Sequence, residues 1–258
     1  MDIEKKVYRT PDGLPVDIAI FTILSREQPS SYRTLAHREL NVLLVKRSRD
    51  SEAFPGYWAL PGGFSGENET LAEAAYRELK EETNVDNFVR IEQVKTVYYP
   101  GRDPRGWMPS VVYCALVQER HLLNLAADTD AEEAKLFTIG EALEMTLAFD
   151  HHELLQDTLE HVRHMMMSTT IASEFLPEEF TIRELYQVIQ AVVPSFEEDI
   201  ANFKRNLLAT KTRKGLICES VGANGEPRTS DRHSNRPAQL YRFSGYEPSI
   251  SIYNSGIF

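Results

Sequence analysis

Three glutamates on one short stretch of this 258-residue chain are spaced to bind a divalent cation. Glu78, Glu81 and Glu82 stand at i, i+3 and i+4, so on a helix their carboxylates share an arc of roughly 100°. Carboxylates this close repel one another unless a cation lies among them. Hard oxygen ligands suit Mg²⁺ (or Mn²⁺), whose coordination is completed by the phosphate oxygens of a substrate. We therefore predict a metal site at these glutamates, and a catalytic role for them and for Arg77.

A helix must position these side chains, and the residues before them predict where it begins. Thr70 and Glu73 form a capping box, which predicts a helix over residues 71–83. Arg77 lies four residues from both Glu73 and Glu81, so either pair could hold it. The alternative is a solvated amphipathic helix whose acidic face binds nothing. The fixed spacing and the glycine loop before the helix favour the metal site.

The order of glycine, glutamate and Arg-Glu-aliphatic-x-Glu-Glu over residues 62–85 resembles the Nudix box. That box is the signature of a family that hydrolyses nucleoside diphosphates linked to another moiety. Gly63 opens the pattern, and one position departs from it, because Asn84 stands where the family has glycine. This position is a helix C-cap that needs φ > 0, and Asn is the best non-glycine residue there. The loop-helix-loop is therefore still expected.

Length and composition predict a soluble, cytoplasmic protein of two domains. The chain is longer than the roughly 150 residues that one Nudix domain needs. Its 42% hydrophobic and 26% charged residues are ordinary for globular proteins. Cys114 and Cys218 form no paired motif, so no disulfide framework or zinc site is suggested. No apolar segment reads as a signal peptide or a membrane span, and no membrane partner is expected.

The distribution of charge predicts a nucleic-acid contact. The whole chain carries a net charge of −11, which alone argues against such a partner. Residues 203–243, however, hold nine basic and three acidic side chains, a net charge of +6, so the remainder carries −17. An acidic body with one basic segment indicates that the segment meets an anionic partner.

Hydrophobic patterns predict the remaining elements of the first domain. Strands are expected at 16–24, 41–47, 91–99, 110–117 and 135–139, and a closing helix at 151–167. Four histidines lie on that helix and raise the question of a metal site: His151, His152, His161 and His164. No carboxylate accompanies them in a recognised pattern, so packing is the favoured explanation.

A second unit begins near residue 170 with two helices joined by a tight turn. They are predicted at 182–192 and 196–209, on either side of a Val-Pro pair that cannot continue a helix. Each begins with a capping box: Thr181-x-x-Glu184 for the first and Ser195-x-x-Glu198 for the second. Such a pair makes a helix-turn-helix, whose second helix is free to meet DNA.

Segments 214–221 and 238–244 alternate like a β-hairpin and resemble the wing of a winged helix domain. The hairpin tip is expected to carry the last three of the predicted DNA contacts. Those contacts are Lys204, Arg205, Lys211, Arg213, Lys214, Arg228, Arg232 and Arg236. The alternative is a helical cap that only mediates dimers. Such a cap does not require a net charge of +6 in an otherwise acidic protein, so DNA binding is favoured.

As far as about Gly245, the chain resembles the Nudix-related transcriptional regulators of NAD metabolism. The resemblance rests on PGRDPRGWMPSVVYCALV, LAFDHHELL, LPEEFTIRELYQVIQAV, NFKRNLLATK and RPAQLYRF. It implies an α/β (α+β) chain, with an N-terminal Nudix α/β/α sandwich at 1–170. A C-terminal winged helix-turn-helix domain with a tail would follow at 171–258. It also implies a homodimer that binds double-stranded operator DNA and senses ADP-ribose or a related nucleotide.

Two functions stay open. The first is a nucleotide-responsive regulator, expected to be a repressor. The second is a Mg²⁺-dependent ADP-ribose pyrophosphatase, and one chain could do both. Many members of this branch have lost the Nudix box and only bind the ligand, but this chain retains the box, so hydrolysis stays open. Ligand contacts are predicted at Gly63, Tyr98, Arg102 and Arg105. Tyr98 (or Tyr99) could stack on a base and the arginines could hold phosphates, although core tyrosines and solvated arginines are equally good explanations.

Overall fold

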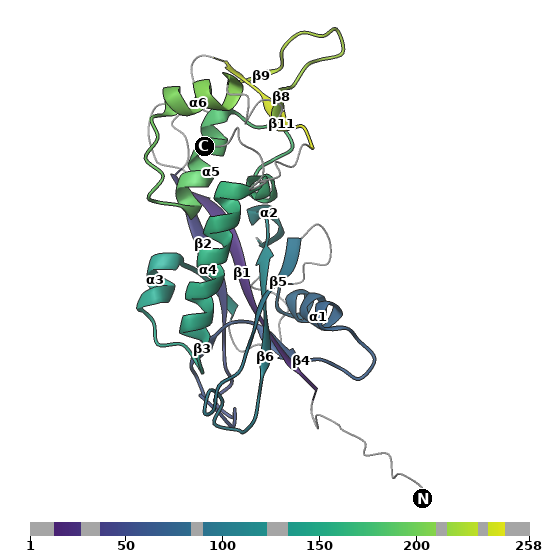
Figure 1. Cartoon of the computed structure of the whole chain (residues 1–258), viewed down its shortest axis with the longest axis vertical. Coiled ribbons are helices and arrows are strands. Elements are labelled where there is room, and N and C mark those ends of the chain that lie inside the picture. Colours follow the sequence, from purple (N-terminus) through teal and green to yellow (C-terminus); the bar gives the residue numbers. More distant parts are fainter. Residues whose placement is uncertain are drawn as a thin grey trace, which may run out of the picture.

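The computed structural model describes residues 13–26, 37–83, 90–122, 134–209, 216–231 and 237–245. Several predicted positions lie outside these described residues: Asn84, Lys211, Arg213, Lys214, Arg232 and Arg236. The described part of the chain is elongated, with a sheet and its helices at one end and the winged helix at the other (Figure 1).

A seven-stranded mixed sheet forms the centre of the described N-terminal part (Figure 1). Its path is β3-β2-β1-β6-β5, with β4 paired to β1 and β7 paired to β2. The strands β1 and β6 run parallel, and the other pairs run antiparallel. The strands are β1 (Pro15–Arg26), β2 (His37–Lys46), β3 (Trp58–Ala59), β4 (Gly62–Phe64), β5 (Arg90–Val97), β6 (Ser110–Leu116) and β7 (Ala134–Thr138).

Of the helices of this part, α1 and α4 lie where the sequence patterns predict, and α2 and α3 are additional. They are α1 (Leu71–Thr83), α2 (Glu119–Leu122), α3 (Ile139–Glu144) and α4 (His151–Ser168). The capping box before α1 is confirmed, because the Glu73 carboxylate accepts from the Thr70 amide at 2.7 Å and the Thr70 hydroxyl accepts from the Glu73 amide at 3.2 Å. The five predicted strands are all present, although β5 ends at Val97 rather than at residue 99.

Both faces of the sheet are covered, which confirms the predicted α/β/α sandwich. Side chains of β1 alternate between the faces, as the two-residue period of a strand requires. Ile18 and Ile20 share a buried cluster with Leu79 of α1. Phe21 shares the opposite cluster with Leu155 of α4. This double burial explains why β1 and β6 read as nearly continuous apolar runs.

The C-terminal part is a winged helix. A short 3₁₀ helix, η1, leads into it, and its elements are η1 (Ile171–Phe175), α5 (Ile182–Val192), α6 (Ile200–Ala209), β8 (Ile217–Glu219), β9 (Thr229–Ser230), β10 (Ala238–Gln239) and β11 (Tyr241–Phe243). The predicted hairpin is confirmed by the antiparallel pairing of β8 with β11. The capping box of α5 is also confirmed, with the Thr181 hydroxyl accepting from the Glu184 amide at 3.2 Å.

The predicted capping box at Ser195 is wrong, because α6 begins at Ile200 and not at residue 196. Asp199 caps the helix instead: its Oδ1 accepts from the amides of Ala201 and Asn202 at 3.0 and 3.1 Å. The Pro-Ser pair forms a turn, in which the Phe196 amide donates to the Val193 carbonyl at 2.9 Å. The ring of Phe196 then packs against Tyr186 and Phe203. Aromatic packing therefore overrides the local capping signal.

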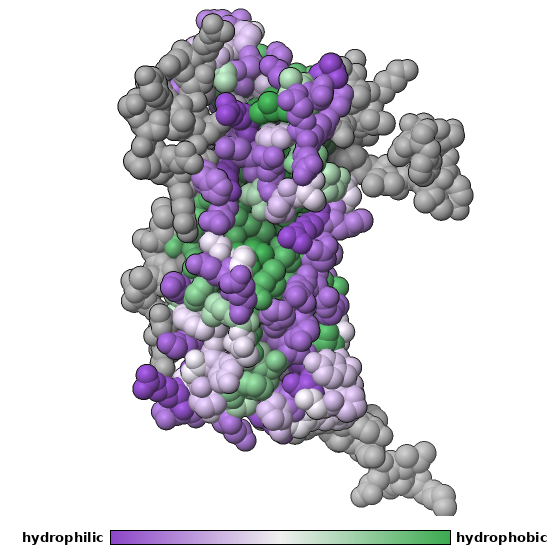
Figure 2. All heavy atoms as spheres, turned by 90° about the vertical axis from the view of Figure 1, so that its left-hand side faces the viewer, coloured by the Kyte–Doolittle hydropathy of each residue, from purple (hydrophilic) through white to green (hydrophobic). Residues whose placement is uncertain are grey.

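One apolar cluster runs from the sheet through α4 into the winged helix. Phe180 and Tyr241 exchange backbone hydrogen bonds of 2.9 and 2.8 Å, which join the start of α5 to the wing. Figure 2 shows hydrophobic residues gathered at mid-height on one face of the molecule. The division at residue 170 stays a prediction, and the core is continuous across it.

A shared core predicts that the two parts unfold together. Phe180 is fully buried and its ring lies 5.0 Å from that of Phe243. We expect Phe180→Ala to lower the free energy of unfolding by about 3–5 kcal/mol, measured by urea denaturation with fluorescence and circular dichroism. Both probes should report one transition. Trp107→Ala is the control, because that side chain is 79% exposed and should change the stability by only about 0.5 kcal/mol. Two separate transitions, with only one shifted by Phe180→Ala, would contradict the shared core.

Candidate functional site

The loop between β4 and α1 brings Gly63 against the glutamates of the predicted metal site. A Cβ atom at Gly63 would overlap the carboxylate of Glu78, so only glycine leaves that carboxylate in place. Glu69 accepts from the Gly66 amide and closes the loop. Glycine is thus required here by the close approach of a side chain rather than by a turn.

Arg77 organises the carboxylates around it. Its guanidinium donates to Glu69 at 2.8 Å, to Glu78 at 2.7 Å and to Glu81 at 3.2 Å. It also donates to the carbonyl oxygen of Phe64 at 2.9 Å. The hydrogen bonds that Arg77 donates to Glu69 and Glu78 raise its pKa further above the usual value. The predicted Arg77–Glu81 pair is confirmed.

The other predicted partner of Arg77 is replaced. Glu73 caps α1 through Thr70, and Glu69, from the preceding loop, takes the arginine instead. Helical spacing identifies pairs within a helix, but it cannot identify a partner that the loop folds back into place.

The three glutamates of α1 differ in exposure and in acidity. Glu78 is buried, Glu81 is exposed and Glu82 is half-buried. Burial raises the pKa of Glu82 to about 7, and the charges of Glu78 and Glu81 add to this effect. Burial also raises the pKa of Glu78, against the opposing hydrogen bond from Arg77. The Oε2 atom of Glu82 is buried without a hydrogen-bond partner. An orphaned carboxylate oxygen beside two more carboxylates fits a Mg²⁺ or Mn²⁺ ion.

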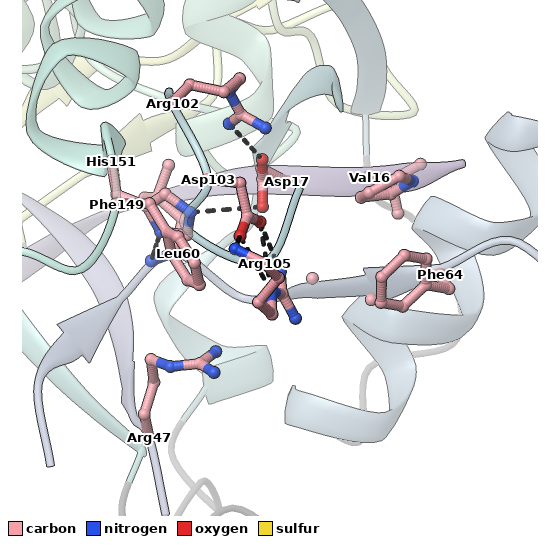
Figure 3. Close-up of a pocket in the computed structure, with 13 residues that line it drawn as sticks. Val16, Asp17, Arg47, Leu60, Phe64, Arg102, Asp103, Arg105, Phe149 and His151 are labelled. Atoms are coloured by element: carbon pink, nitrogen blue, oxygen red, sulfur yellow. Dashed lines mark hydrogen bonds and ion pairs between the residues drawn. The ribbon is translucent and has the colours of Figure 1, made fainter. Parts of the chain in front are cut away.

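A pocket of about 220 Å³ is lined in part by Gly63, the glycine that lies against Glu78 (Figure 3). Strands β1 and β4, the loop after β5 and the start of α4 form its walls. Three of the predicted ligand residues line it: Gly63, Arg102 and Arg105. The others that line it are Pro15, Val16, Asp17, Arg47, Leu60, Gly62, Phe64, Asp103, Phe149 and His151.

Arg102 forms part of the pocket wall. Its Nε and Nη2 atoms donate to the carboxylate of Asp150 at 2.9 and 2.7 Å, and its Nη1 donates to the carbonyl of Met108 at 3.0 Å. Both side chains of this ion pair are about 95% buried. Because its donors are engaged in this way, Arg102 holds the loop after β5 against the start of α4. Its contact with a phosphate stays a prediction.

Arg105 and Arg47 both lie close to the Phe149 ring. Their guanidinium carbons are 5.1 and 4.9 Å from the ring centroid. Arg105 is also held by Asp103, with Nη2 donating at 2.7 Å. Burial, followed by the charge of Arg105, lowers the pKa of Arg47. Both guanidinium groups line the pocket.

Sequence reasoning missed Arg47 and Asp17 as pocket residues. Arg47 follows directly on the buried strand β2, and a basic residue at the end of such a strand was the signal available. Asp17 accepts from the Ser110 hydroxyl at 2.6 Å and lies 3.7 Å from Arg102. Phe149 was missed as well; its backbone adopts φ 52°, which is uncommon for a residue with a large side chain.

His151 is held as a neutral side chain. Its Nδ1 accepts from the Leu60 amide at 2.9 Å, so the proton resides on Nε2, which lies 3.4 Å from Asp17. Burial lowers the pKa of His151. The packing explanation therefore holds for this histidine, which connects the start of α4 to the β3–β4 turn.

Tyr98 lies outside the residues that line this pocket. It is 51% exposed and makes an edge contact with Trp107, at 6.1 Å between ring centroids. Tyr99 is 49% exposed, so the alternative in which both tyrosines are core residues is wrong. A stacking role for Tyr98 stays a prediction.

The proposed DNA-facing residues are placed on the winged helix. Lys204 and Arg205 are exposed on α6, and Arg205 donates to the Asn202 side chain at 2.7 Å. Arg228 does not lie at the tip of the wing. Its backbone bonds to Ser220 within the wing, and its side chain pairs with Glu179 at 2.9 Å. Within the described part of the wing, the chain reverses at residues 222–225, before Arg228.

Within the described ranges, no helix is both long and apolar enough to cross a membrane.

Comparison with known proteins supports both halves of this arrangement. The NUDIX domain family matches residues 30–158, and the NrtR DNA-binding winged helix domain matches residues 172–243. A relative from Acinetobacter baylyi, the ADPR responsive transcriptional repressor NtrR, is 31% identical over 243 residues, which span 93% of this chain and 85% of the relative. The chain belongs to the NrtR family.

Solved structures agree with membership of the NrtR family. The crystal structure of Shewanella oneidensis NrtR complexed with a 27mer DNA is 30% identical and superposes with a TM-score of 0.66. The match covers 91% of this chain and 96% of that chain. The Nudix part also resembles an ADP-ribose pyrophosphatase from Methanocaldococcus jannaschii, at 34% identity over 146 residues, 52% of this chain and 81% of the relative.

The raised pKa of Glu82 predicts that metal binding to this NrtR-type Nudix helix depends on pH. Below its pKa of about 7 the carboxyl group is protonated, and a cation must displace that proton. We expect the Mg²⁺ affinity to fall about tenfold between about pH 8 and about pH 6, measured by calorimetry. Glu82→Gln should weaken binding and flatten this dependence, whereas Glu67→Gln, an exposed loop carboxylate, should leave both unchanged. An equal affinity at the two pH values would exclude Glu82 as a ligand.

Proposed function

We propose that this protein is a DNA-binding transcriptional repressor of NAD metabolism genes that responds to ADP-ribose. Its similarity over 93% of its length to a repressor named for its response to ADPR supports this function. The match to an NrtR structure solved with DNA supports the assignment of α6 and the wing to DNA binding. In this proposal the Nudix part is the sensor, and the winged helix is the output.

The observation that carries the proposal is the course of α4. The helix begins in the pocket wall at His151 and runs 18 residues, about 27 Å. Near its other end, Arg163 donates to the carbonyl of Val192, the last residue of α5, at 3.2 Å. One rigid element therefore contacts both the pocket and the helix-turn-helix.

The pocket suits a dinucleotide-like diphosphate. Arg47 and Arg105 present two cations in the pocket that Gly63 also lines. A diphosphate would compete with Asp103 for Arg105, because both anions need the same guanidinium edge. Since Arg102 joins this loop to Asp150 at the start of α4, a ligand that moves the loop would also bias the position of α4. In a homodimer, such a shift changes the spacing of two winged helices and lowers the affinity for operator DNA.

The DNA-binding prediction is tested by gel shift on the DNA upstream of the protein's own gene and of NAD-synthesis genes. The full chain should bind a roughly palindromic site, and ADP-ribose should release it. Binding should weaken steeply between about 50 and 200 mM salt as phosphate contacts release counterions. Arg205→Ala should weaken specific binding about tenfold, whereas Lys135→Ala removes an exposed charge on β7 and should leave it unchanged. No footprint at low salt in the absence of nucleotide would exclude the repressor function.

Arg105 and Arg102 should differ in what they contribute. Arg105→Ala removes a cation from the pocket and should weaken ADP-ribose binding about tenfold in calorimetry. Arg102→Ala leaves Asp150 buried without its partner, so it should lower the free energy of unfolding by about 3–5 kcal/mol. Arg49→Ala, at an exposed position near β2, is the control for both. Unchanged ADP-ribose affinity in both pocket variants would remove this loop from the ligand site.

A second candidate function is hydrolysis of ADP-ribose. The observation that favours it is the complete carboxylate set of α1, with the orphaned Oε2 of Glu82, together with the resemblance to a pyrophosphatase. Glu78, Glu81 and Glu82 would hold the cation, which when bound supplies charge neutralisation on the diphosphate and an activated water. Arg77 orients these carboxylates, and Gly63 leaves Glu78 the space that it needs. Slow hydrolysis would let the sensor reset.

Turnover is tested with purified protein, ADP-ribose and Mg²⁺ or Mn²⁺. Addition of water across the diphosphate should yield AMP and ribose 5-phosphate, resolved by chromatography. Glu81→Gln and Glu82→Gln should each abolish the products, since each removes a metal ligand, whereas Glu67→Gln should retain them. No turnover by the wild-type protein, with ADP-ribose affinity retained, would leave the Nudix helix with a sensing role alone.

A further inference from the structure

A second group of metal-ligand side chains lies on the other face of the sheet. Glu92 of β5 and Cys114 of β6 stand directly opposite each other in the antiparallel register, so their side chains share one face. Cys114 belongs to the apolar cluster beneath α4, and α4 brings His161 against the pair. The glutamates of the Nudix helix lie on the opposite side, with α1.

The three ligand atoms are close enough to converge on one ion. One ring nitrogen of His161, one carboxylate oxygen of Glu92 and the Cys114 Sγ all lie within 4.8 Å of one another. Nε2 and Oε1 are 2.8 Å apart. Around a tetrahedral zinc ion, ligand atoms are about 3.3–3.6 Å apart, as follows from the usual bond lengths. Small rotations of two side chains that are partly solvent-exposed would therefore open the site for a cation.

The surroundings of the three side chains allow a cation to enter from solvent and hold the ligands in place. The side chains of His161 and Glu92 are 32% and 26% exposed, so an ion can reach them from solvent. Arg90 donates to the other carboxylate oxygen of Glu92 at 3.2 Å and steadies it. Cys114 is 2% exposed and forms the floor of the site. Burial raises the pKa of its thiol to about 12, so a bound cation must displace a proton there.

We propose that Glu92, Cys114 and His161 bind a divalent cation of the zinc class, with a fourth position open to water or an exogenous ligand. The set of one nitrogen, one sulfur and one oxygen ligand prefers Zn²⁺ or Co²⁺ over Mg²⁺, which favours oxygen alone. The ion would link two strands to α4, the helix that spans the pocket and the winged helix. Cation binding would therefore stabilise the docking of α4 on the sheet.

The test is a titration of the full chain with Co²⁺ after treatment with a chelator. Cobalt bound to a thiolate gives a charge-transfer band in the near ultraviolet, whereas cobalt on the carboxylates of α1 gives none. We expect this band to saturate at one equivalent, to disappear when Zn²⁺ is added, and to persist in Glu82→Gln. Excess Mg²⁺ should leave it unchanged.

Matched variants assign the ligands. Cys114→Ser should abolish the band, and His161→Ala and Glu92→Gln should each weaken Co²⁺ binding at least about tenfold. The controls are Cys218→Ser, which removes the other thiol of the chain, and His164→Ala, which removes an exposed histidine from the next turn of α4. Both should bind as the wild type does. Circular dichroism checks that each variant is folded, and Glu92→Gln, which preserves shape, keeps the test valid if Cys114→Ser unfolds.

Three outcomes would overturn the proposal. The first is the absence of a thiolate band in the wild-type protein, which would leave His161 and Glu92 as a simple ion pair. The second is a band that survives Cys114→Ser or is lost in Cys218→Ser, which would place the ion elsewhere. The third is Co²⁺ affinity unchanged in both His161→Ala and Glu92→Gln.

Discussion

The buried ion pair between Arg102 and Asp150 is the interaction on which the geometry of the pocket depends. Its two parallel hydrogen bonds join the loop after β5 to the start of α4, and Asp17 of β1 lies 3.7 Å from the same guanidinium. Removing either partner would strongly destabilise the fold, because the other would remain buried and charged. His151 follows Asp150 in the chain, and Arg105 lies in the same loop as Arg102. One pair thus positions a cation, a neutral histidine and the end of a helix.

The Nudix helix shows the opposite arrangement, in which unfavourable interactions are concentrated. Glu78, Glu81 and Glu82 repel one another, and burial adds to the cost for Glu78 and Glu82. Arg77 offsets part of that repulsion but leaves the Oε2 of Glu82 without a partner. A divalent cation bound there would relieve this residual repulsion.

Both ends of the molecule are joined through one apolar core rather than through a flexible linker. The aromatic packing of Phe180 with Phe243 and the Arg163–Val192 hydrogen bond connect α4, α5 and the wing. A sensor and an output that share a core can be coupled by a small movement, because packed elements shift as units. The same continuity places any ion held by α4 and the sheet within the path between the two sites.

The sequence by itself determined the elements whose signals are local. The capping box and the i, i+3, i+4 glutamates predicted α1, its metal face and its limits, and apolar periodicity predicted the strands, α4 and α5. Tertiary structure decided what depends on distant partners. Arg102 meets Asp150 across 48 residues, Glu69 replaces Glu73 beside Arg77, and Phe196 overrides the cap at Ser195. Caps and periodicity arise from backbone geometry within a few residues, whereas buried ion pairs and metal sets depend on distances and desolvation that exist only once the chain has packed.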